Sequence, residues 1–272
     1  MRFLERVIEE KKEEVAAKRV RRPIAQLERA AGDIPVRDFR RAIAGGGRII
    51  AEVKKKSPRF TRFRQSDNAD GLARIYETGG ASAISVVTDA PNFGTSLDDA
   101  RRIKQEVSIP VLVKDFIIDP YQVYEARAFG ADAVLLIGRL IEPEALASLL
   151  ELARRLGMHA LVEVHTRADL DGALEEDAGI IGINNRDLDT LEVDLNTTKE
   201  LLGGIPEGKT VVSESGHSRR GDIESLSALG VDAFLIGGAL LESPDPARLL
   251  QELLVRDDTG IDPAQNERTR HA

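Results

Sequence analysis

The amino-acid sequence predicts an α/β fold, a (β/α)8 TIM barrel with an N-terminal helical extension, and two observations indicate it. First, several short apolar runs end abruptly in a charged or amide residue, as in 48–54, 110–115 and 159–163. Strands buried on both faces read as continuous apolar runs, because helices cover each side of a parallel sheet. Second, helical patterns alternate with these runs, which favours a closed barrel with an active site at its C-terminal rim.

The segment before the first strand predicts the N-terminal extension. Residues 3–18 have the pattern of an amphipathic helix, and the charge run at 9–14 is expected to form its solvated face. Pro23 stops or redirects this helix, and a short helix is expected over 36–44, before three glycines at 45–47. The apolar stripe of the first helix consists of Leu4, Val7, Ile8 and Val15.

After the three glycines, strand and helix patterns alternate regularly. Helical patterns cover 69–78, 96–107 and 142–156, among others. Residues 130–138 (GADAVLLIG) are echoed by 230–238 (GVDAFLIGG), half a barrel later, which indicates an internally repeated half-barrel. The eight strands are expected near 48–53, 83–87, 110–114, 133–137, 159–164, 180–184, 209–213 and 232–236.

These patterns divide the chain into three parts. We expect the helical extension over 1–46, the barrel over 47–255 and a disordered polar tail over 256–272. The length of 272 residues accommodates one barrel of about 250 residues and a modest extension. No linker rich in Pro, Gly or Ser interrupts the alternation, which argues against two smaller domains.

Composition and charge argue against several classes of partner. The formal net charge is −8 and the Lys and Arg residues are spread along the chain, so no nucleic-acid partner is expected. No apolar stretch approaches the ~20 residues of a membrane span, and the charged N-terminus is unlike a signal peptide. We therefore expect a cytoplasmic protein with no membrane partner, working as a monomer or weak homo-oligomer. Cysteine is absent and the four histidines lack metal-ligand spacing, so no bound metal is expected.

Glycines after each of the last two strands predict a phosphate site. Gly237 and Gly238 follow the eighth strand, and Ser215 and Gly216 follow the seventh. These loops often bind phosphate in barrels, because glycine lets backbone N–H groups approach an anion beside a helix N-terminus. A tight turn explains either pair alone, but their joint position favours a phosphorylated small-molecule substrate.

Charged side chains at the strand ends predict acid–base chemistry. Glu52 and Lys54 are two residues apart and share a face of the first strand, while Lys114 closes the third strand and Glu163 lies near the end of the fifth. Carboxylates and lysines around one pocket shift one another's pKa values, as general acid–base catalysis requires. A structural ion-pair network is the alternative interpretation. Further polar groups on the same rim are Asn184, Arg186 and Ser215.

Two aromatic residues fall in loops on the same rim. Phe93 follows the second strand and Phe116 follows the third. Packing within the loop is the ordinary explanation for such residues. Together with Pro58 and Leu135, however, they predict an apolar slot for a planar ring.

At this point the residues resemble a known family, the indole-3-glycerol-phosphate synthases. The resemblance runs from the N-terminal helix to about residue 255 and implies a (β/α)8 barrel with an N-terminal helical segment. It also implies ring closure of 1-(2-carboxyphenylamino)-1-deoxyribulose 5-phosphate, with loss of carbon dioxide and water, in tryptophan biosynthesis and without a cofactor. The motifs that carry it are 50–58 (IAEVKKKSP), 114–122 (KDFIIDPYQ), 161–164 (LVEV), 181–188 (IGINNRDL) and 213–216 (SESG).

The resemblance also implies roles for individual residues. Lys114 resembles the general acid that protonates the substrate's ketone oxygen, and Glu163, Lys54 and Glu52 are the candidates for the acid–base pair of dehydration. Asn184 would bind sugar hydroxyls and orient Glu163 or Lys114. The remaining roles concern substrate binding: Lys56 and Arg186 for its anionic ends, Ser57, Gly216, Gly237 and Gly238 for the phosphate, and Glu214 with Ser215 to complete the rim.

The sequence departs from the family pattern at a few positions, which keeps two alternatives open. Residues 59–64 (RFTRFR) replace a loop that is usually small and rich in Ser and Gly, and Thr95, His217 and Gly238 replace other usual residues. One alternative is a neighbouring phosphate-binding barrel, such as phosphoribosylanthranilate isomerase or the tryptophan synthase alpha subunit. The other is a catalytically silent binding barrel.

Overall fold

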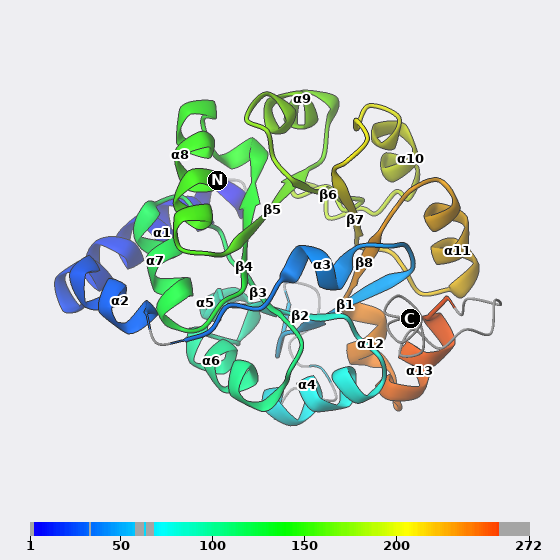
Figure 1. Ribbon diagram of the computed structural model, residues 1–272, viewed down its shortest axis with the longest axis horizontal. Helices are drawn as coiled ribbons and strands as arrows, with labels where there is room; N and C mark the ends of the chain where they lie inside the picture. Colours follow the sequence, from blue (N-terminus) through cyan, green and yellow to red (C-terminus); the bar gives the residue numbers. More distant parts are fainter. Residues whose placement is uncertain (1–2, 33, 58–62, 64–67, 256–272) are drawn as a thin grey trace, which may run out of the picture.

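The structure, a computed structural model, describes residues 3–32, 34–57, 63 and 68–255. Eight parallel strands form a closed barrel in sequence order, with β8 returning to β1 (Figure 1). The predicted fold class is thus confirmed, and every strand lies within one residue of its predicted position. The strands are β1 (Arg48–Val53), β2 (Ala83–Val87), β3 (Val111–Lys114), β4 (Ala133–Ile137), β5 (His159–Val164), β6 (Ile180–Asn184), β7 (Thr210–Glu214) and β8 (Ala233–Ile236).

Helices between the strands form the outer layer of the barrel (Figure 1). Those that precede β1 are α1 (Phe3–Arg21), α2 (Ile24–Ala31) and α3 (Phe39–Ile43). Those around the barrel are α4 (Ala69–Thr78), α5 (Ala90–Phe93), α6 (Leu97–Glu106), α7 (Pro120–Ala128), η1 (Gly138–Leu140), α8 (Pro143–Arg155), α9 (Arg167–Glu175), α10 (Asn196–Leu202), α11 (Arg220–Ala228), α12 (Gly238–Glu242) and α13 (Pro246–Leu253). The predicted tail at 256–272 and the unusual loop at 59–64, except Phe63, lie outside the described residues.

The alternation of side chains along each strand creates two apolar layers. On β1, Ile49 and Ala51 pack outward against the helices, whereas Ile50 joins a second cluster inside the barrel. Phe39 and Ile43 of α3 belong to the inner cluster, so α3 closes the N-terminal end of the barrel. Glu52 has the same parity as Ile50, which directs it to the interior near the opposite, C-terminal end.

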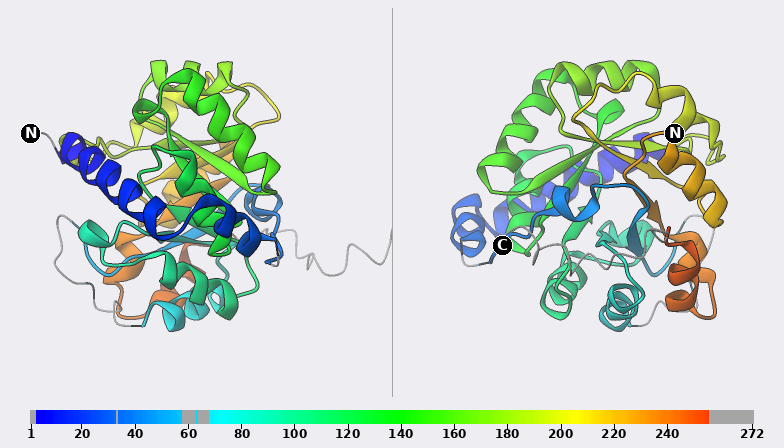
Figure 2. Two further views of the ribbon diagram at one scale, coloured as in Figure 1. Left: turned by 90° about the vertical axis from the view of Figure 1, so that its left-hand side faces the viewer. Right: turned by 45° about the vertical axis from the view of Figure 1, so that its right-hand side comes forward.

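The extension before β1 contains one helix more than the sequence predicted. α1 runs three residues beyond the expected end and lies along the flank of the barrel (Figure 2). Pro23 then serves as the N-terminal cap residue of α2, which packs against α7 together with α1. α2 spans only eight residues, so its apolar period was too short to distinguish from a loop.

The prediction that the charge run of α1 is solvated is wrong at Lys11. This side chain is only 3% exposed, and its Nζ lies 2.9 Å from Asp115 Oδ1, 3.1 Å from Asp89 Oδ1 and 2.9 Å from Glu14 Oε2. Burial alone lowers the pKa of Lys11, but the three carboxylates outweigh it and hold that pKa above its ordinary value. Lys11 therefore ties α1 to the loops that follow β2 and β3.

Replacing Lys11 with methionine is expected to lower the free energy of unfolding by about 3–5 kcal/mol. The buried carboxylate of Asp89 and that of Asp115, which is 11% exposed, would lose their cation. Urea denaturation measures this change. The matched control is Lys12→Met: Lys12 is the next residue, its side chain is 60% exposed, and its loss should change stability by about 0.5 kcal/mol or less. Equal effects of the two substitutions would contradict the buried ion-pair cluster.

Candidate active site

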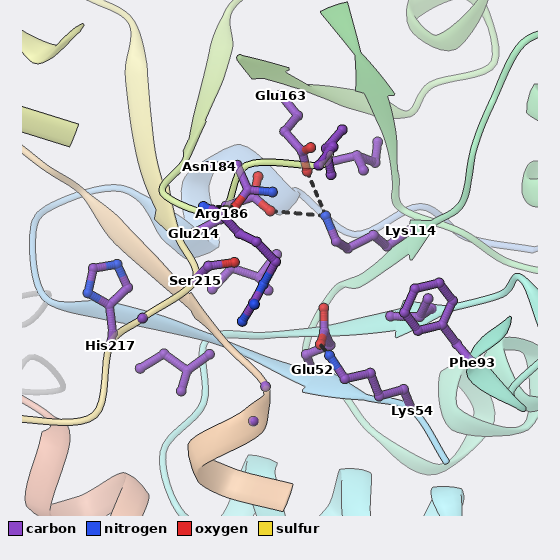
Figure 3. Close-up of a pocket in the computed structure, with 18 of the residues that line it drawn as sticks. Glu52, Lys54, Phe93, Lys114, Glu163, Asn184, Arg186, Glu214, Ser215 and His217 are labelled. Atoms are coloured by element: carbon purple, nitrogen blue, oxygen red, sulfur yellow. Dashed lines mark hydrogen bonds and ion pairs between the residues drawn. The ribbon is translucent and has the colours of Figure 1, made fainter. Parts of the chain in front are cut away.

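A cavity of about 430 Å³ opens at the C-terminal ends of the strands (Figure 3). All eight strands or their following loops contribute to its wall, as the barrel interpretation predicts. The sequence-predicted residues that line it are Glu52, Lys54, Phe93, Lys114, Phe116, Leu135, Glu163, Asn184, Arg186, Glu214, Ser215, Gly216, Gly237 and Gly238.

Of the predicted residues that the structure describes, Lys56 and Ser57 do not line this cavity. Pro58, predicted for the apolar slot, lies outside the described residues. The chain turns aside after β1: the backbone N–H groups of Lys55 and Lys56 donate to the carbonyl oxygen of Phe93, each at 3.0 Å. The side chain of Lys56 accordingly packs beside Gly94. Lys56 therefore flanks the wall at Phe93.

Lys114 is the centre of the charged groups in the cavity. Its Nζ lies 2.7 Å from Glu163 Oε2 and 3.1 Å from Glu214 Oε2. Figure 3 marks both contacts with dashed lines. Burial alone lowers the pKa of Lys114, but Glu163, Glu214 and Glu52 outweigh it and raise that pKa above its ordinary value. Lys114 is therefore an ammonium ion at neutral pH, with its proton available to a ligand in the cavity.

The two carboxylates beside Lys114 differ in protonation. Burial and the negative charge of Glu163 raise the pKa of Glu214 to about 8, although Lys114 opposes the shift. Burial also acts on Glu163, but Lys114 and a hydrogen bond from Asn184 outweigh it and keep its pKa below the ordinary value. Below about pH 8 the site therefore holds one neutral carboxylic acid and one carboxylate, an arrangement suited to acid and base roles.

Glu52 and Lys54 form a second ion pair on the other side of the cavity. Lys54 lies one residue beyond the end of β1, and its Nζ is 2.5 Å from Glu52 Oε1. Burial raises the pKa of Glu52, but Lys54 and Lys114 outweigh it and lower that pKa below its ordinary value. Figure 3 shows this pair opposite Glu163 and Glu214, so a bound ligand would lie between two charged groups.

Two glycine turns form the wall near β7 and β8. Ser215 and Gly216 have positive φ angles of 67° and 88°, a conformation that strains a residue with a side chain. A Cβ atom on Gly216 would lie 2.6 Å from Val193 Cγ1, and one on Gly237 would lie 2.3 Å from Glu52 Oε1. The backbone comes so close to its neighbours at these two positions that only glycine fits without displacement.

Sequence reasoning missed Asn185, which holds the first of these turns. Its buried Nδ2 donates to the carbonyl oxygens of Glu214 and Ser215, at 3.0 Å and 3.1 Å, and to Ser213 Oγ at 3.1 Å. Its Oδ1 accepts hydrogen bonds from the N–H and hydroxyl of Thr198. The signal in the sequence was a second asparagine directly after Asn184, the last residue of β6.

Asp115 was also missed, although it directly follows Lys114. Its Oδ2 accepts a hydrogen bond from Thr88 Oγ1 at 2.7 Å, and its Oδ1 lies 2.9 Å from Lys11 Nζ. Asp115 and Asp89 both line the cavity. They connect the cavity wall to α1, a connection that depends on the closed tertiary structure.

Within the described ranges, no helix is both long and apolar enough to cross a membrane. The same part of the chain shows no group of three or more His, Asp or Glu residues arranged to hold a metal ion.

Comparison with solved structures finds the same fold in other proteins. A thiamine phosphate pyrophosphorylase from Pyrococcus furiosus is 16% identical, with a TM-score of 0.58 over 79% of this chain and 96% of that one. A 3-hexulose-6-phosphate synthase is also 16% identical, with a TM-score of 0.59 over 76% of this chain and 97% of that one. At such identities the likeness shows the fold alone.

Comparison of sequences is more specific. An indole-3-glycerol phosphate synthase of Dehalococcoides mccartyi (strain CBDB1) is 47% identical over 258 residues, which cover 93% of this chain and all of the relative. One from Chlorobaculum tepidum is 46% identical over 249 residues, covering 90% of this chain and 97% of the relative. A family model described as indole-3-glycerol phosphate synthase matches residues 4–253. These matches agree with the barrel and its charged rim, and they show that the chain belongs to the indole-3-glycerol phosphate synthase family.

Proposed function

We propose that this protein converts 1-(2-carboxyphenylamino)-1-deoxyribulose 5-phosphate into indole-3-glycerol phosphate, carbon dioxide and water. The observation that carries the proposal is the position of Lys114, an ammonium ion between Glu163 and Glu214 in the cavity. The reaction needs a proton donor for a ketone and an acid–base pair for dehydration, and this arrangement supplies both without a cofactor.

Ring closure is the step assigned to Lys114. The aromatic carbon that bears the substrate's carboxylate attacks the ketone carbon, and the ketone oxygen takes a proton from Lys114 Nζ. A carbon–carbon bond forms and an iminium cation develops on the substrate. Glu52 and Glu163, whose pKa values lie below the ordinary value despite burial, supply the negative charge that stabilises this cation.

Decarboxylation and dehydration follow from the same intermediate. The bond to the carboxylate breaks, and its electron pair restores the aromatic ring and neutralises the nitrogen. Glu163 then removes a proton from the methylene carbon beside the nitrogen, and the new hydroxyl group leaves as water after protonation. Lys54, paired with Glu52, is assigned as that proton donor, and protonated Glu214 is placed to return a proton to Lys114.

The remaining predicted residues are assigned to substrate binding. Backbone N–H groups at Gly216, Gly237 and Gly238 hold the phosphate beside Ser215. Ser57 is assigned to the phosphate as well. Asn184 binds sugar hydroxyls, while Arg186 and Lys56 serve the anionic ends. The apolar part of the wall, which would hold the aromatic ring, consists of Phe93, Phe116 and Leu135.

The assignment of Gly237 leads to a testable prediction. In Gly237→Ala the new methyl group displaces the Glu52 carboxylate, so kcat/KM is expected to fall by about 10²-fold. The matched control is Gly203→Ala, because a Cβ atom on Gly203 meets nothing within 4 Å. Steady-state kinetics of both variants decide the matter, and a wild-type kcat/KM in Gly237→Ala would refute the assignment.

Substrate discrimination tests the proposed function against its alternatives. The protein is given the carboxyphenylamino-deoxyribulose phosphate and, separately, phosphoribosylanthranilate, and indole fluorescence and substrate consumption are followed. We expect indole-3-glycerol phosphate from the first compound and no conversion of the second. Isomerisation of the second would identify a neighbouring barrel enzyme, whereas binding of the first without turnover would identify a silent binding barrel.

Two further properties complete the proposal. We expect the protein to act in the cytoplasm, as a monomer or weak homo-oligomer. Light scattering at micromolar concentration measures the mass, for which 29.7 kDa is the monomer value.

A further inference from the structure

The two halves of the barrel repeat one acid–base pair. In β1 the fifth residue is Glu52 and Lys54 comes two residues later; in β5 the fifth residue is Glu163 and His165 comes two residues later. The repeat agrees with the echo of 130–138 in 230–238, half a barrel apart. His165 is therefore the counterpart of Lys54, and the function proposed above gives it no role.

The geometry of the second pair parallels that of the first. His165 Nε2 lies 3.3 Å from Glu163 Oε1, while the other carboxylate oxygen, Oε2, is 2.7 Å from Lys114 Nζ. The side chain of His165 is 5% exposed and that of Glu163 is 1% exposed. Glu163 thus lies between a lysine on one side and an imidazole on the other, just as Glu52 is paired with Lys54.

The imidazole is held in place but leaves its hydrogen-bonding capacity unused. Among the described residues, neither ring nitrogen of His165 has a hydrogen-bond partner, and Oε1 of Glu163 has none either. Buried polar atoms are rarely left unpaired, and catalytic hydrogen bonds are often poorly aligned until substrate binds.

Four charged groups surround the ring. Glu163 on β5 faces Nε2, and Asp169 on α9 has Oδ2 4.0 Å from Nδ1. The positive charges of Arg139 on η1 and Lys114 on β3 also act on the ring and lower the pKa of His165. Asp169 Oδ2 also accepts the backbone N–H of His165 at 2.9 Å, which anchors the residue at the start of α9. Burial lowers the pKa of His165 below its ordinary value, so the ring is neutral at pH 7 and carries one N–H.

We propose that His165 is a positioning residue for Glu163: its neutral imidazole donates an N–H to Oε1 and so keeps this carboxylate ionised and correctly aimed. The inference rests on the proposed function, in which Glu163 is a base. When the substrate engages the ammonium of Lys114, the ion pair at Oε2 weakens. The imidazole then supplies the hydrogen bond that keeps Glu163 an anion and fixes its orientation toward the reacting carbon.

The first test compares pH profiles of kcat. In His165→Leu the acidic limb is expected to move up by about one pH unit, because the Glu163 carboxylate loses a hydrogen bond to its charged form. His165→Gln retains an N–H donor that does not titrate, so its acidic limb should stay near that of the wild type. The matched control is His159→Leu, at the opposite end of β5, whose ring contacts Asp38 outside the cavity.

The second test does not require turnover. Nitrogen-15 NMR of the four imidazoles follows each titration, and the signals of His165 are assigned from their loss in His165→Gln. In Glu163→Gln the pKa of His165 is expected to fall further, because the imidazolium loses a neighbouring negative charge.

The outcomes separate this inference from the proposed function. Superimposed acidic limbs of wild type and His165→Leu would overturn the inference, as would an unchanged His165 titration in Glu163→Gln. A wild type without turnover would overturn the proposed function instead, and the NMR titration would then decide the pairing of His165 with Glu163 by itself.

Discussion

Replacing Lys114 with alanine is expected to lower kcat by about 10²–10⁴-fold, the usual effect of losing a general acid. The ketone oxygen then lacks its proton donor during ring closure. Glu163 and Glu214 also lose the cation that lies between them, 2.7 Å and 3.1 Å away. The initial rate of indole fluorescence, measured at saturating substrate, reports kcat directly.

The control for this substitution is Lys209→Ala. Lys209 precedes β7 at the N-terminal end of the barrel, where it pairs with the exposed Asp177 outside the cavity. Its kcat should equal that of the wild type. A Lys114→Ala protein that is folded and keeps more than about a tenth of wild-type kcat would remove Lys114 from the role of general acid.

Replacing Glu163 with glutamine is expected to have an effect of similar size, about 10²–10⁴-fold on kcat. The amide keeps the shape of the side chain and can still accept a hydrogen bond from Lys114, but it cannot take a proton. KM should therefore change little, because substrate binding does not depend on this proton transfer. Full progress curves give kcat and KM together.

Glu151→Gln is the matched control, since Glu151 is an exposed residue of α8 that pairs with Arg154. It should leave both constants unchanged. If Glu163→Gln raised KM and left kcat intact, Glu163 would be a binding residue and the base of the dehydration step would lie elsewhere.

Most of the site was predictable because a parallel barrel brings the residues at the ends of all its strands to one rim. Glu52, Lys114 and Glu163 each end an apolar run, and the carboxyl ends of parallel strands meet at one rim. Their meeting in one cavity therefore followed from strand prediction alone. Similarly, Gly216 and Gly237 were identified from their places after the seventh and eighth strands, before the Cβ contacts that exclude larger residues were visible.

What the sequence did not reveal depends on contacts between distant segments. Lys11 lies in a charge run that resembles a solvated helical face, and its buried partners Asp89 and Asp115 follow two different strands. Local periodicity contains no information on such pairings, because they arise only when the barrel closes.

The most direct test of the proposed function is the molar ratio of its two carbon-containing products, indole-3-glycerol phosphate and carbon dioxide. The wild-type protein is given the carboxyphenylamino-deoxyribulose phosphate labelled with carbon-13 in its carboxyl group, and indole-3-glycerol phosphate and labelled carbon dioxide are quantified together. The mechanism predicts equal amounts of both, because each ring closure is followed by one decarboxylation. If the labelled carboxylate stayed attached to the substrate and no indole-3-glycerol phosphate formed, the assignment of this cavity as the site of ring closure would be contradicted.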